Sequence, residues 1–196
     1  MIKVVMVLDA TQSTAAAQPR IVNAGVVEVR NGKPTITFNG TTQFLTRSTG
    51  VSFNATEIDA FYVSTNFSGT TALHRDRPLV EGRHYYGQAG WAIGGTFSTL
   101  TLTGVGGQAI LSYLLNSVNT GANFKTVDSA ITFAGDPTGL TRFFVGAGVS
   151  VTAGVSPNEF FNGDIQEVLW FKGVSKLSER GSIVTNMNNF YDVVIS

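Results

Sequence analysis

The stretch that decides the fold reads Phe160-Phe161-Asn162-Gly163-Asp164-Ile165-Gln166-Glu167-Val168-Leu169-Trp170-Phe171. A glycine leads into an apolar run of β-branched and aromatic residues, which is typical of a strand. Leu177-Ser178-Glu179-Arg180 and a short amphipathic segment follow directly. This order predicts a closing strand and a terminal helix on a β-sandwich. It narrows the fold more than the function, because a sandwich can bind, assemble or hydrolyse.

The terminal helix is predicted to begin near Ser178, which is a favourable N-cap residue, with Glu179 in the first turn to suit the helix dipole. Helical spacing places one apolar stripe along it. The stripe consists of Ile183, Val184, Met187, Phe190 and Tyr191, and the opposite polar face carries Thr185, Asn186 and Asn189. We expect the apolar stripe to lie on the sandwich.

Upstream of this stretch, strand-like segments and turns recur roughly every eight to twelve residues, a spacing typical of a sandwich or barrel. Asn31-Gly32 and Asn39-Gly40 are tight-turn signals on either side of an alternating strand at residues 34–38. Alternating βα units are missing, which argues against a parallel α/β fold. Other predicted strands are residues 26–30, 57–64, 83–87, 90–94, 98–103, 130–133 and 141–145, whereas 109–115 fits a strand or a helical turn.

Composition is even along the chain, so residues 1–196 are interpreted as a single domain. Met1–Leu8 is predicted to be a first strand, since its apolar run stops at Asp9, short of the roughly seven residues that a signal peptide needs. No apolar stretch approaches the length of a membrane span.

Charge and cysteine content exclude several classes of partner. The chain has 13 basic and 13 acidic side chains, and its charged fraction of 13% is about half the usual share. No positive field attracts nucleic acid or anionic membranes, so both are excluded as partners. The absence of cysteine excludes a disulfide framework and a thiolate metal site, and it fits folding in a bacterial cytoplasm.

Two parts of the chain resemble a known family. Gln18–Gly25 with Asn31–Gly40 resembles the opening of concanavalin A-like (laminin-G-like) jelly-roll domains, and Phe161–Val168 with Leu177–Arg180 is similar to their end. The resemblance implies an all-β fold, an antiparallel jelly-roll β-sandwich with one C-terminal α-helix. Such domains recur in bacteriophage virion proteins and beside the fungal arabinofuranosidase B catalytic domain.

The chain departs from that family in one respect. In phage relatives, a Trp-Tyr-Asp-Gln-Ser-Gly-Asn-Gly type of stretch usually precedes the first segment, whereas Met1–Leu8 stands in its place here. Features of that stretch are therefore not carried over to this chain.

A candidate glycan site consists of Arg83, His84, Tyr85 and Trp91, which concentrate aromatic rings and hydrogen-bond donors. Sugar sites stack ring faces on Trp or Tyr and bind hydroxyls through polar neighbours. Alternation sends Tyr85 and Tyr86 to opposite faces, so one patch takes only one of them. The alternative, which we favour, is that these rings fill the core between two sheets.

Catalytic and metal-binding patterns are weak. A glycosidase needs two facing carboxylates, and no motif singles out a pair among Glu57, Asp59, Asp76, Glu81, Asp128, Asp136, Glu159, Asp164 and Glu167. We interpret Glu167, within its apolar strand, as a structural carboxylate held by backbone or a hydroxyl. Asp136 and Asp164 offer oxygen ligands for calcium, but turn formation explains the first. We therefore assign no catalytic residue, no metal and no cofactor.

The favoured function is a non-enzymatic bacteriophage virion protein, made in the bacterial cytoplasm. It would be a capsid decoration or head-fibre protein, or a tail-fibre module, that acts in assembly and surface display. Its expected partners are other virion proteins and further copies of itself in a symmetric assembly, with a cell-surface glycan as an additional partner. A lectin-like carbohydrate-binding module is the alternative, and a glycoside hydrolase ranks third.

Overall fold

The computed structural model describes most of the chain in segments. These segments are residues 10–47, 58–66, 78–80, 84–85, 88–89, 98–99, 108–115, 120–124, 127–130, 143–148, 157, 159–172, 176 and 178–193. The predicted first strand Met1–Leu8, the predicted strand at 90–94 and the turn predicted at Asp136 lie outside them.

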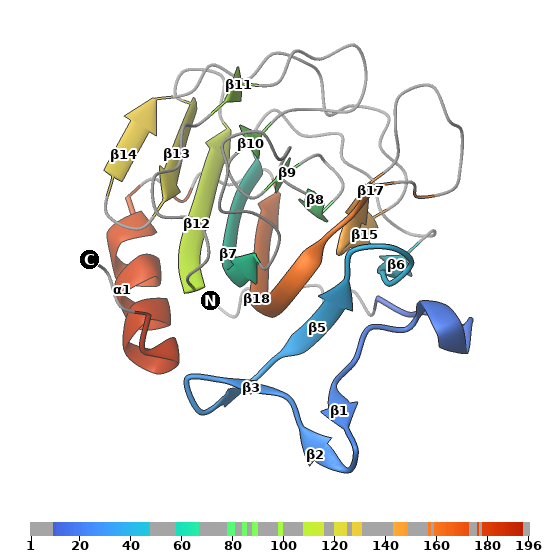
Figure 1. The fold of residues 1–196 in the computed structure, drawn as a ribbon. Coiled ribbons are helices and arrows are strands. Elements are labelled where there is room, and N and C mark those ends of the chain that lie inside the picture. Colours follow the sequence, from blue (N-terminus) through green and yellow to red (C-terminus); the bar gives the residue numbers. More distant parts are fainter. Residues whose placement is uncertain are drawn as a thin grey trace, which may run out of the picture.

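Antiparallel strands make up most of the described elements (Figure 1). The strands are β1 (Val22–Asn23), β2 (Val26–Val27), β3 (Val29–Arg30), β4 (Lys33–Pro34), β5 (Ile36–Asn39), β6 (Leu45–Arg47), β7 (Ile58–Asn66), β8 (Pro78–Val80), β9 (His84–Tyr85), β10 (Gln88–Ala89), β11 (Ser98–Thr99), β12 (Gln108–Leu115), β13 (Thr120–Phe124), β14 (Val127–Ala130), β15 (Phe143–Val145), β16 (Ala147–Gly148), β17 (Glu159–Phe160) and β18 (Asn162–Lys172). A 3-10 turn, Ala15–Ala17, and the helix α1, Arg180–Tyr191, complete the described elements.

Twelve of the described strands form two six-stranded sheets, and the other six form the two-stranded sheets β1-β2, β3-β4 and β16-β17. The first sheet has the order β14-β13-β12-β7-β18-β5, and the second has the order β11-β10-β9-β8-β15-β6. The chain changes sheet from β5 to β6, from β6 to β7 and from β7 to β8. The prediction of an antiparallel β protein with a C-terminal helix is therefore confirmed, and 108–115 is a strand.

The decisive stretch of the sequence forms β18, which lies inside the first sheet between β5 and β7. It pairs with β7 from Gly163 opposite Asn66 to Lys172 opposite Ile58, so it joins an early strand to a central one. The register shifts between Ile165 and Glu167, which makes Gln166 the extra residue of a β-bulge.

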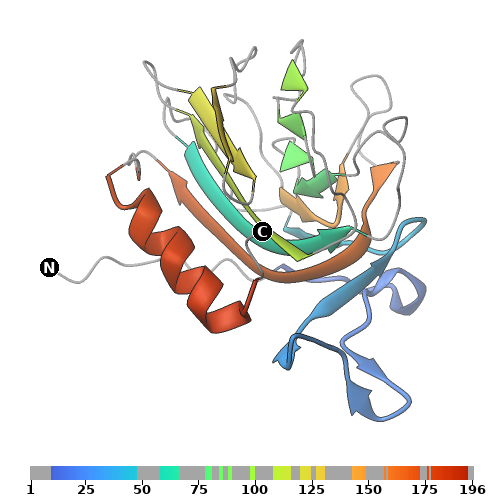
Figure 2. The ribbon, with the colours of Figure 1, turned by 60° about the vertical axis from the view of Figure 1, so that its left-hand side comes forward.

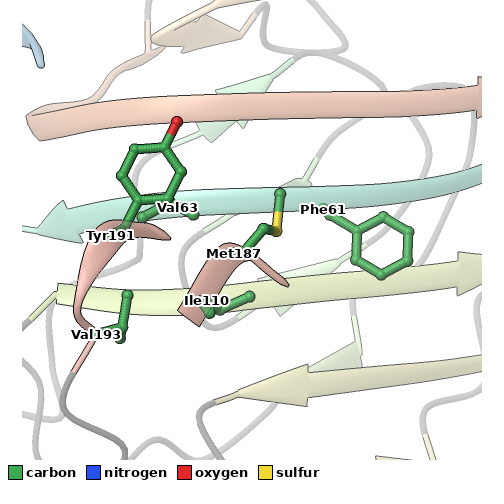
Figure 3. Packing of buried hydrophobic residues seen from close by; sticks show 6 residues of the cluster. All are labelled: Phe61, Val63, Ile110, Met187, Tyr191 and Val193. Carbon is green, nitrogen blue, oxygen red and sulfur yellow. The ribbon is translucent and has the colours of Figure 1, made fainter. Parts of the chain in front are cut away.

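The helix α1 covers one face of the first sheet, and strands β8–β11 lie on the other side (Figure 2). Met187 and Tyr191 of α1 point at Phe61 and Val63 of β7 and at Ile110 of β12 (Figure 3). Burial of such side chains is worth about 1.5–3 kcal/mol each. Phe61 and Val63 therefore lie on the buried face of β7 that α1 covers.

The opposite face of the first sheet packs through aromatic rings. Phe38 of β5 is buried and meets Phe161 edge to face, with ring centroids 6.3 Å apart. Its ring lies against Gly146, where an added Cβ would approach a ring carbon to 2.2 Å. Only glycine fits there, and this close approach joins β5 to the segment that connects β15 and β16.

Two details of the helix differ from the prediction. The N-cap residue is Glu179 rather than Ser178, whose hydroxyl donates to the Glu179 carboxylate at 2.6 Å instead of capping the helix. Phe190 leaves the buried stripe and is 55% exposed. It lies under the Lys33 ammonium, 4.2 Å from the ring centroid, so a cation–π contact takes the place of core packing.

Candidate functional site

The glycan site expected from the sequence is only partly within the described residues. The backbone of His84 and Tyr85 forms β9, which pairs with β8 and β10 in the second sheet. Arg83 and Trp91 lie outside the described residues, and so do the side chains of His84 and Tyr85. Their grouping into one patch remains a prediction.

A different surface feature stands out on the described part of the chain. Residues 21–27, here called the arm, form the hairpin β1–β2 that projects from the body (Figures 1 and 2). Its apolar side chains face solvent: Val26 is 69% exposed and Ile21 52%. Val22 and Val27 are exposed as well. Contiguous exposed apolar residues of this kind are typical of interaction surfaces.

Local sequence explains why the arm is a hairpin. Val22 pairs with Val27, and Asn23 pairs with Val26, so the chain reverses at Ala24 and Gly25. These two residues have φ values of 49° and 84°, as a type I′ turn requires, and such turns match the twist of paired strands. Adjacent pairs point to opposite faces, so each face of the arm displays valine.

The stem of the arm is fixed to the open edge of the first sheet. The backbones of Arg20 and Thr37 exchange two hydrogen bonds of 2.9 and 2.8 Å, and the Thr35 amide donates to the Glu28 carbonyl at 3.0 Å. The Arg20 and Glu28 side chains form an ion pair across the stem. These contacts cover the edge of β5 and hold the arm at a fixed origin.

The next hairpin, β3–β4, anchors the same region to β18. Arg30 donates to one carboxylate oxygen of Asp164 through Nε at 3.0 Å and through a terminal nitrogen at 2.6 Å. Thr37 donates its hydroxyl to the other oxygen at 2.7 Å. Asp164 is almost fully buried, so this charge is satisfied by two neighbouring elements. The Asp164 carboxylate, which the sequence offers as a calcium ligand, thus accepts hydrogen bonds from Arg30 and Thr37 at both of its oxygens.

Gln166, the bulged residue, supplies a further anchor. Its side-chain amide nitrogen lies 3.1 Å from the Arg30 carbonyl oxygen and 3.2 Å from that of Lys33. Asn31 donates its amide to the Asp192 carbonyl at the end of α1, over 2.7 Å. The hairpin β3–β4 therefore contacts both β18 and the helix end, and the base of the arm is held rigidly.

The bulge also places two carboxylates on one face of the sheet. Asp164 lies opposite Thr65 and Glu167 lies opposite Val63, which share a face of β7. Burial raises the pKa of Glu167, and a hydrogen bond from the Tyr191 hydroxyl partly lowers it. Burial first, and then the charge of Glu167, raise the pKa of Tyr191 to about 12. The Tyr191 hydroxyl also donates to the Gln166 carbonyl oxygen at 3.4 Å, and the structural role of Glu167 stays a prediction.

The carboxylates of Asp59 and Glu179 also contact structural partners. Asp59 accepts a hydrogen bond from the backbone N–H of Lys176, and the Lys176 ammonium lies 3.3 Å from Glu179. Within the described segments, no three His, Cys, Asp or Glu side chains are grouped so that they could hold a metal ion. The remaining acidic candidates Glu57, Asp76, Glu81 and Asp136, with the side chains of Asp128 and Glu159, lie outside the described residues.

Sequence reasoning missed the arm as a site. Residues 26–30 are predicted only as a strand, and the sequence analysis assigns no site to residues 21–27. The available signal was an uncharged run, residues 21–27, with apolar residues on both sides of an Ala-Gly turn. A strand that is half buried alternates in polarity, and this run does not.

No helix in the described segments has the length and apolar character needed to cross a membrane.

Comparisons with known proteins add no assignment. No protein-family model matches the chain, and no curated protein matches its sequence.

Proposed function

We propose that this chain is a non-enzymatic structural protein of a bacteriophage virion, a capsid decoration, head-fibre or tail-fibre module. Its two sheets would form a concanavalin A-like jelly roll. Three features support this proposal. Residues 18–25 with 31–40 and residues 161–168 with 177–180 resemble phage jelly-roll domains. The chain also crosses repeatedly between two antiparallel sheets, and it is low in charged residues.

The exposed apolar arm is the observation that carries the proposal. Monomeric soluble proteins rarely leave a contiguous group of large aliphatic side chains in water. Covering them stabilises an assembly by about 25 cal/mol for each Å² of apolar surface removed from water. An arm on a rigid body is therefore suited to assembly with neighbouring subunits.

The mechanism follows from how the arm is held. The stem is hydrogen-bonded to β5, and β3–β4 is tied to Asp164 and to the end of α1. Little backbone order remains to be gained when a neighbour docks, so the entropic cost of association is low. Repetition of one such contact in a closed symmetric array adds the separate contacts together.

The test of this function uses virus particles. Particles from the source that encodes the chain should contain it in a fixed ratio to the major capsid or tail protein, as measured by quantitative mass spectrometry. Purified chain should rebind to particles that lack it, and the double variant Val22→Ser, Val26→Ser should rebind at least about tenfold more weakly. Absence from particles together with failure to rebind would overturn the proposal.

A further inference from the structure

The exposed apolar side chains of the described residues are concentrated in one place. Of the large hydrophobic side chains that the structure describes as exposed, all except Phe190 lie between positions 21 and 29. These residues are Ile21, Val22, Val26, Val27 and Val29. Within the described part of a second copy, the main apolar surface available to an arm is therefore another arm.

The charges around the arm favour the same partner. The run from Ile21 to Val27 carries no charged residue, and the two charges at its stem, Arg20 and Glu28, neutralise one another. The formal net charge of the chain is zero, so copies do not repel each other at long range. A strongly charged partner would gain nothing from this neutral surface, whereas an identical neutral surface meets it without desolvating an ion.

The shape of the arm suits a ribbon-like partner of the same width. Val22 and Val27 share one face, and Val26 lies on the other. Both strands of the arm pair only with each other in their two-stranded sheet. When a two-fold axis relates two arms, each contact between a residue of one copy and a residue of the other occurs twice. Every favourable contact is therefore counted twice.

We propose that the arm, residues 21–27, is the contact through which two copies of this chain associate, arm against arm. The inference rests on the proposed assembly function, since it names the partner of that same surface. A standard interface buries roughly 800 Å² on each partner. The seven residues of the arm offer a smaller contact surface than that. The isolated pair is therefore weak, and it gains strength when other contacts of an assembly hold two arms close together.

The experiment measures self-association of the purified full chain by sedimentation over a range of micromolar concentrations. We expect a reversible monomer–dimer equilibrium. The double variant Val22→Glu, Val26→Glu should weaken it at least about tenfold, because like charges then meet across the contact. The matched variant Thr185→Glu, Asn189→Glu adds the same charge on exposed positions of α1 and should change it less than about twofold. Circular dichroism checks that both variants are folded.

Cross-linking locates the contact independently. The chain contains no cysteine, so Val22→Cys and Val26→Cys each introduce a unique thiol, one on each face of the arm. At least one of them should give a covalent dimer with a short bis-maleimide, and Thr185→Cys should give none. A chain that stays monomeric throughout, or a dimer that the arm variants leave unchanged, would overturn arm pairing.

The outcomes separate this inference from the proposed function. A chain that dimerises through its arm but is missing from particles upholds arm pairing and overturns the virion role. A chain that is present in particles but monomeric in solution, and whose arm variants lose only particle binding, identifies another virion protein as the partner. That result overturns arm pairing and leaves the virion role standing.

Discussion

Two carboxylates on β18 show how strongly the surroundings of a residue decide its role. Asp164 is buried against the guanidinium of Arg30 and the hydroxyl of Thr37. Glu167 is partly buried and contacts Tyr191, a neutral donor. Asp164 therefore links β18 to neighbouring elements through its charge, whereas burial disfavours the charged form of Glu167.

Asp164→Asn is expected to lower the free energy of unfolding by about 2 kcal/mol, because Arg30 and Thr37 lose a charged acceptor. Urea denaturation measures the loss. Arg20→Gln is the matched control, since it removes an ion pair whose arginine is about half exposed, and it should cost less than about 1 kcal/mol. Equal losses in the two variants would contradict the role assigned to Asp164.

Glu167→Gln is expected to remove the pH dependence that the Glu167 carboxyl gives to the free energy of unfolding. Burial raises the pKa of Glu167 above 4.5, so the folded chain holds a proton that the unfolded chain has lost. The stability from this group is complete below the unfolded pKa and is lost as the pH rises through the folded pKa. Relative to the original chain, the variant should therefore gain stability from about pH 4 to pH 7 in urea titrations. A difference that does not change with pH would contradict this.

The strand β18 and the helix α1 are the elements that the sequence predicts best. The apolar run of β18 and the helical spacing of Met187 and Tyr191 are local patterns, and both occur where expected. The bulge at Gln166 is not visible in the sequence, because it depends on the carbonyls of β3–β4 that Gln166 reaches. The exposure of Phe190 was missed for a similar reason, since Lys33 belongs to a distant segment.

Met187→Ala should separate core from surface along α1. Met187 is buried against β7 and β12, so its loss should cost about 2–5 kcal/mol through lost burial and a cavity. Phe190→Ala removes a larger side chain from the same predicted stripe, yet it should cost less than about 1.5 kcal/mol, from the contacts with Lys33 and with the Tyr191 ring. Thermal unfolding of the two variants compares the losses, and a reversed order would contradict the packing described here.

Gly163→Ala and Gly181→Ala should change stability in opposite directions. A Cβ on Gly163 would lie 2.0 Å from the Thr65 carbonyl oxygen of the neighbouring strand, and backbone cannot move aside cheaply. We expect a loss above about 2 kcal/mol, comparable to overpacking of a core. Gly181 lies in α1 with open space around it, so alanine there should stabilise by up to about 1 kcal/mol. Chemical denaturation of both variants checks the signs.

At the scale of the whole molecule, the helix and the two sheets form a body from which the arm projects (Figure 2). The class of the body follows from turn signals and strand spacing, which are local. The arm does not, because its exposure depends on where the stem meets β5. Arg20 and Thr37 are 17 positions apart, and no periodicity in the sequence reveals that they pair.

Association through neutral arms predicts an unusual response to salt. Raising sodium chloride from about 0.05 to 0.5 M should change the dissociation constant by less than about twofold, because screening acts only on charges. Ammonium sulfate should strengthen association, since excluded salts favour burial of apolar surface. Sedimentation in each salt measures the constant. Marked weakening by sodium chloride would instead indicate an ionic contact.

The stem bound along β5 has a consequence for how the protein can be stored. It occupies the backbone groups through which a further strand would otherwise add to that side of the sheet. Beyond the stem, each strand of the arm is only two residues long, too short to seed a cross-β fibril. We therefore expect that in crowded solutions neither the β5 edge nor the arm starts the growth of a fibril, so contacts at this side of the molecule yield small discrete complexes.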